Sequence, residues 1–179
     1  MKKDYRLYNM ILPPYLIMAF SPIFLAISAV GNFIIDSVVL LIISAFVFRK
    51  LDSSFYVKNI FKVWGLGFAA DFVGVIYLFI GGQLGYDYIN SGVPAGTFLF
   101  NIFDGMNSVT NHSNEITPFT IGFLISGIII SAICVFVFDF FIAFRKSGLT
   151  KKQRLVSSAA YAVFTAPYTF LLPYDLFYS

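Results

Sequence analysis

The amino-acid sequence predicts an all-α integral membrane protein, a bundle of about five transmembrane helices. The 179 residues are 59% hydrophobic and only 12% charged, with a mean hydropathy of +0.83. Soluble domains are about half apolar and about a quarter charged, so water cannot be the only solvent of this chain. The length has room for about five spans of about 20 residues, without a separate soluble domain. We therefore expect one transmembrane domain over residues 1–179.

Long apolar segments place the predicted spans. Residues 7–48 are too many for one crossing of a bilayer core about 30 Å thick, and they suit two crossings with a turn at Gly31 and Asn32. We expect Gly81 and Gly82 to close the third span. The five expected spans cover residues 8–30, 32–48, 63–80, 119–144 and 155–172.

The longest expected loop covers residues 83–118 and lies outside the cytoplasm. Its middle, residues 97–103, is too short to cross a membrane and is predicted to form a re-entrant or interfacial turn.

Basic residues predict the orientation of the bundle. Of the 12 lysines and arginines, three precede the first span, four lie between the second and third, and five lie between the fourth and fifth. Cytoplasmic loops carry the excess of basic residues in membrane proteins. The sequence therefore predicts a multi-pass cell-membrane protein with a cytoplasmic N-terminus and an extracytoplasmic C-terminus.

Three carboxylates inside predicted spans, Asp36, Asp71 and Asp139, are the candidate site residues, together with Asn32. A carboxylate at the centre of a span costs about 2.5–3.5 kcal/mol, so such residues usually face other helices or a wet cavity. Asp71 is either a ligand- or proton-binding group or a protonated, hydrogen-bonded structural acid.

The two other carboxylates have their own interpretations. Asp36 follows Asn32 by one turn and contacts water, binds a cation or stays protonated. Asp139 is expected to form an ion pair with Lys146 or Arg145, which lie near its helix face.

Other motifs predict little chemistry. The single cysteine, Cys134, permits neither an intrachain disulfide nor a CxxC site. The single histidine, His112, is expected in a solvated loop. Residues 65–70 fit a G-x-G-x-x-A pattern, but no strand precedes them, so we interpret them as a helix-packing surface. Facing aspartates in a protease signature are missing, so an enzyme is the least favoured interpretation. We predict no cofactor, no metal and no nucleic-acid partner.

Small residues four apart mark helix faces that permit close packing. They are Gly122 with Ser126, Gly127 with Ser131, and Ser158 with Ala162 and Ala166. These faces could bind another membrane protein or a second copy of the chain, while lipid covers the rest.

Segments along most of the chain resemble a group of uncharacterised small polytopic membrane proteins from low-GC Gram-positive bacteria. The segments are residues 3–9, 32–36, 62–71 and 164–168. The resemblance implies a bacterial plasma membrane and carries over no activity. Our functional hypothesis is therefore a small transport or ligand-binding membrane component that uses its carboxylates. The alternative is an accessory, assembly or immunity-type protein that binds another membrane protein, with a membrane-embedded enzyme as a minor alternative.

Overall fold

A computed structural model describes residues 22–48, 52–111 and 116–171, and this part of the chain is helical without any strand. Three helices in it are long and apolar enough to cross a membrane, over Ala26–Val47, Ser53–Asn90 and Pro118–Lys146. The all-helical class is confirmed for these residues. The elements in chain order are α2 (Pro22–Phe48), α3 (Ser53–Asn90), α4 (Phe98–Asn111), α5 (Pro118–Phe141), the 3₁₀ turn η1 (Ala143–Lys146), α6 (Lys151–Phe164) and the 3₁₀ turn η2 (Tyr168–Leu171).

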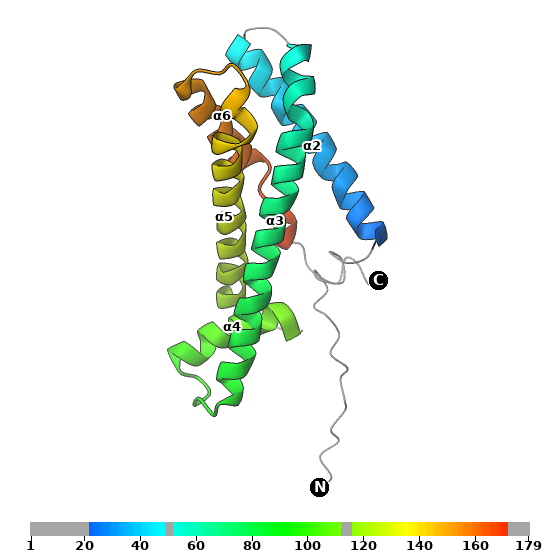
Figure 1. The fold of residues 1–179 in the computed structure, drawn as a ribbon. Helices are drawn as coiled ribbons and strands as arrows, with labels where there is room; N and C mark the ends of the chain where they lie inside the picture. The colour runs from blue at the N-terminus through cyan, green and yellow to red at the C-terminus, as the bar shows by residue number, and fades with distance from the viewer. Residues whose placement is uncertain (1–21, 49–51, 112–115, 172–179) are drawn as a thin grey trace.

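The long helices α3 and α5 lie side by side, and α2 leans away from α3 toward its own N-terminal end (Figure 1). The C-terminal end of α2, the start of α3 and the α5–α6 connection lie at one end of the molecule, and α4 lies across the other end (Figure 1). Every described basic residue belongs to the first of these ends or to the helix turns beside it; they are Lys58, Lys62, Arg145, Lys146, Lys151, Lys152 and Arg154. We call it the basic end.

The expected turn at Gly31 and Asn32 is wrong, because α2 continues through both residues. Glycine and asparagine are weak helix formers, but leaving the helix would free backbone groups that an apolar segment cannot satisfy. The polar side chain of Asn32 also finds a partner on α3. Residues 8–21 of the expected first span lie outside the described residues.

The helix α3 is much longer than the expected span 63–80. Asp52 starts it by accepting hydrogen bonds from the backbone N–H groups of Ser54 and Phe55. Gly81 and Gly82 do not end it, because they are buried where α3 meets other elements: Gly81 lies against Phe123 of α5, and Gly82 lies against Thr110 of α4. Its 38 residues span about 57 Å.

The expected fourth span, residues 119–144, agrees closely with α5. Thr117 and Thr120 form a capping box at its start, with Pro118 in the first turn. The loop expected over 83–118 instead contains the end of α3 and the whole of α4. At 14 residues, α4 is about 21 Å long and too short to cross a bilayer.

The expected fifth span, residues 155–172, is not one helix. The helix α6 starts earlier, with a capping box between Thr150 and Gln153, and ends at Phe164. A short break around Pro167 separates it from η2. Because proline has no backbone N–H and clashes with the preceding turn, the helix cannot continue through it. At 14 residues, α6 is about 21 Å long, so this span was predicted wrongly.

Candidate functional site

Asn32 and Asp71 join α2 to α3. The Asn32 side-chain amide Nδ2 donates a hydrogen bond to Asp71 Oδ2 at 3.2 Å. The other Asp71 oxygen, Oδ1, is buried without a hydrogen-bond partner. The predicted site residues Asn32 and Asp71 therefore meet, although they are 39 positions apart.

Asp36 lies one turn beyond Asn32 on α2 and faces the same stretch of α3. A Cβ atom built on Gly67 would stand 3.7 Å from Asp36 Oδ2. Gly67 precedes Asp71 by one turn, so the missing side chain at Gly67 leaves room for the Asp36 carboxyl. Asp36 is buried, with 4% of its surface exposed.

Asp139 of α5 is buried as well, with 1% of its surface exposed. Val135, one turn before it, belongs to the same apolar core as Leu40, one turn after Asp36. The acids of α2, α3 and α5 thus border one buried core, and we call Asp36, Asp71 and Asp139 the carboxylate cluster. Ionised carboxylates inside one core would repel one another with little screening. The cluster is therefore suited to hold a proton.

The expected ion pair of Asp139 is absent from the described residues. Asp139 is 1% exposed, and its Oδ2 has no hydrogen-bond partner, whereas Arg145 and Lys146 are exposed on η1. The prediction assumed that α5 continues to Lys146 with its helical spacing. The helix ends at Phe141, and the tighter 3₁₀ turn that follows changes the direction of later side chains.

Tyr161 of α6 is a residue that sequence reasoning missed. Its hydroxyl donates a hydrogen bond to the backbone carbonyl of Asp36, and its side chain is 1% exposed. This bond holds the short helix α6 against α2 beside the carboxylate cluster. A tyrosine in the middle of a weakly apolar segment was the available signal, since buried tyrosine hydroxyls usually find a partner.

Buried serines extend the polar interior. The Oγ atoms of Ser131 on α5 and of Ser157 and Ser158 on α6 are buried without hydrogen-bond partners. Leaving a polar group buried and unpaired costs about 1–3 kcal/mol. Three hydroxyls, together with the free oxygens of Asp71 and Asp139, are an unusual density of unsatisfied groups for a helical interior.

Metal ligation does not explain this arrangement. Within the ranges that the structure describes, no three His, Cys, Asp or Glu side chains are placed to hold a metal ion. Cys134 is a free, partly buried cysteine. His112 lies outside the described residues.

Comparison with known proteins adds no assignment. The chain matches no protein-family model, no curated protein and no solved structure. The resemblance to small bacterial membrane proteins therefore remains a prediction, and any function must be argued from the site itself.

Several small-residue faces pack within the chain. A side chain added at Gly74 of α3 would collide with Ser131 of α5, and one added at Gly127 would collide with Leu78. Close approach of α3 and α5 therefore uses faces that were expected to bind a partner. Gly65 and Gly122 differ, because a side chain at either position would meet open space.

Proposed function

We propose that this chain is a small membrane transport or ligand-binding component that takes up a proton at the carboxylate cluster. The observation that carries the proposal is the pair of carboxyls where α2 meets α3: Asp71 is bonded to Asn32, and Asp36 faces Gly67, one turn before Asp71. Within the described residues no lysine or arginine pairs with any of them. Acids placed at such cost inside a membrane usually mark ion or proton pathways.

The differing exposure of the acids supports a path rather than a closed structural site. Asp71 is only partly buried, whereas Asp36 is 4% and Asp139 is 1% exposed. A proton arriving at Asp71 would meet Asp36 next, because Asp36 faces Gly67, one turn before Asp71. Asp71 is therefore the entry group of the proposed site, and Asp139 is its most enclosed member.

Reconstituted vesicles test this proposal directly. The purified chain is incorporated into liposomes with an imposed proton gradient or sodium gradient, and the decay of each gradient is followed by a trapped pH dye or by tracer sodium. We expect the wild type to dissipate the proton gradient faster than protein-free vesicles, with the sodium gradient as the comparison. Asp71→Asn should remove the difference, because the amide cannot release a proton.

The matched control is Asp87→Asn, the same chemical change at an exposed position near the end of α3. It should behave as the wild type. Equal decay rates for wild type and Asp71→Asn would remove Asp71 from the mechanism. A proton gradient that decays no faster than in protein-free vesicles would contradict the proposal as a whole.

An accessory protein that binds another membrane protein is the second candidate. The open space beside Gly122 on α5 favours it, because a glycine that none of the described residues covers suits a closely packed outside helix. Purification from native membranes should then recover a stoichiometric partner, and Gly122→Leu should lose that partner without loss of folding. A partner retained by Gly122→Leu would contradict this use of the face.

A further inference from the structure

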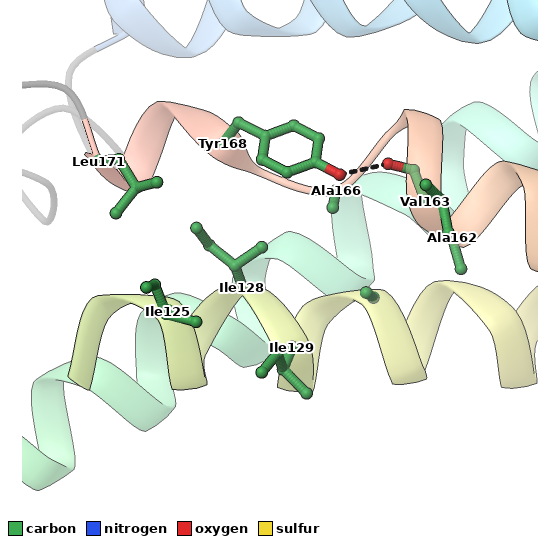
Figure 2. Close-up of a pocket in the computed structure, with 9 residues that line it drawn as sticks. Ile125, Ile128, Ile129, Ala162, Val163, Ala166, Tyr168 and Leu171 are labelled. Atoms are coloured by element: carbon green, nitrogen blue, oxygen red, sulfur yellow. Dashed lines mark hydrogen bonds between the residues drawn. The ribbon is translucent and has the colours of Figure 1, made fainter. Parts of the chain in front are cut away.

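A groove of about 340 Å³ lies between α5 and the end of α6. Figure 2 shows Ile125 and Ile129 of α5 on one side and Val163, Tyr168 and Leu171 on the other. The Tyr168 hydroxyl is bonded to the Val163 carbonyl, so the polar groups at the break after α6 satisfy each other. The side-chain atoms that line the groove are therefore mainly apolar, which suits an apolar ligand.

The walls of this groove continue toward the basic end along both helices. On α6, Lys152, Ala159 and Val163 are separated by seven and four residues and so share one helix face. All three are exposed. On α5, the row passes from Ala132 at the groove to Phe136 and Phe140, whose rings stack with centroids 5.9 Å apart.

The end of the α5–α6 seam that lies at the basic end carries positive charge. Residues 140–154 contain five basic residues and no acidic residue, and Asp139, which precedes them, is buried. The Arg154 guanidinium carbon lies 4.3 Å from the centre of the Phe140 ring, so Arg154 is held against α5. Lys152 lies two residues before Arg154, which places it on the other side of α6, on the exposed face that leads to Val163.

We propose that the α5–α6 seam binds an anionic phospholipid, with its phosphate at Lys152, a second positive charge supplied nearby by Arg154, and one acyl chain in the groove. From Arg154 to Ala162 the helix rises about 12 Å, within the length of an acyl chain. The two ends of the seam thus match the two parts of a phospholipid: basic residues attract anionic headgroups, and the hydrocarbon walls suit the chain. The inference uses the membrane setting but not the carboxylate cluster.

Thermal unfolding of the full-length protein in neutral detergent tests the headgroup. Phosphatidylglycerol should raise the Tm more than phosphatidylcholine with the same chains. Lys152→Gln should weaken the apparent affinity for phosphatidylglycerol about fivefold, since each basic residue near anionic lipid contributes about 1 kcal/mol. The Lys152→Gln, Arg154→Gln double variant should lose the preference, and Arg154→Lys should keep most of it. Lys58→Gln, an exposed charge on α3, is the control and should keep all of it.

Filling the groove tests the acyl chain. Ile129→Trp adds volume inside the groove and should reduce the Tm shift, whereas Ile34→Trp on α2, exposed to a similar extent (57% against 53%) and outside the groove, should not. Soluble glycerol phosphate, which has the headgroup charge without chains, should give no comparable shift.

Three results would overturn the assignment. They are equal stabilisation by the two lipids, an unchanged preference in the double Gln variant, and a shift from glycerol phosphate as large as that from the lipid. A change of oligomeric state in Ile129→Trp with unchanged lipid preference would also overturn it, in favour of a protein helix in the groove.

Discussion

The side chain of Asn32 on α2 holds the carboxyl group of Asp71 on α3 through one hydrogen bond of 3.2 Å. The asparagine thus serves as an interhelical donor inside a continuous helix, next to Gly31. The bond also fixes one oxygen of Asp71 and leaves the other without a partner. Asp71 Oδ2 therefore contributes to the packing of α2 on α3, and Oδ1 stays available for chemistry.

Asn32→Ala should destabilise the protein by about 1–3 kcal/mol, because it leaves both oxygens of a partly buried carboxyl unpaired. The free energy of unfolding in mixed micelles is the appropriate measurement. Asn90→Ala removes an exposed amide at the end of α3 and should change stability by less than about 0.5 kcal/mol. An equal loss of unfolding free energy in the two variants would show that the hydrogen bond to Asp71 does not stabilise the protein.

Gly67 should accept a methyl group and reject a larger side chain. The built Cβ lies at ordinary contact distance, 3.7 Å, from Asp36 Oδ2, so Gly67→Ala should be neutral or stabilising by up to about 1 kcal/mol through helix propensity. Gly67→Leu should cost about 1–3 kcal/mol by overpacking. Gly65→Leu, where the structure has open space, is the matched control. Tolerance of leucine at both positions would contradict the close approach of Asp36 to α3.

Tyr161→Phe should loosen α6 from α2. It removes the hydroxyl that bonds to the Asp36 carbonyl and should cost about 0.5–1.5 kcal/mol. Backbone hydrogen exchange should therefore become faster in α6, with little change in α5. Tyr168→Phe, which removes a local bond to Val163, should leave the protection of α6 before Val163 unchanged. Unaltered exchange in Tyr161→Phe would mean that apolar packing alone positions α6.

Cysteine labelling should place the basic end in the cytoplasm. In a Cys134→Ala background, an impermeant maleimide added to intact cells should label Ala95→Cys, in the exposed turn before α4. It should label Lys152→Cys only after the membrane is permeabilised, since basic loops stay on the cytoplasmic side. The reverse labelling pattern would invert the proposed orientation.

Apolar runs were sufficient to predict an all-helical chain with helices long and apolar enough to cross a membrane, and the extent of α5. Hydropathy could not distinguish one long helix from two spans with a turn at Gly31. Whether a glycine stays helical depends on the packing and polarity around it, which the sequence does not show. The end of α6 was missed because residues 155–172 are apolar enough to be counted as a span despite Pro167. The contact of Asn32 with Asp71, 39 positions apart, could not be predicted either, because it depends on how α2 packs on α3.

The length of α3 has a mechanical consequence. An upright helix of about 57 Å exceeds a bilayer of about 40–45 Å including headgroups. Its C-terminal end, which packs against α4 through Gly85, would then protrude into the medium as a continuous helix. Asp71 lies near the middle of the same continuous helix. A molecule bound to the protruding end would therefore act on the helix that carries Asp71 without entering the membrane.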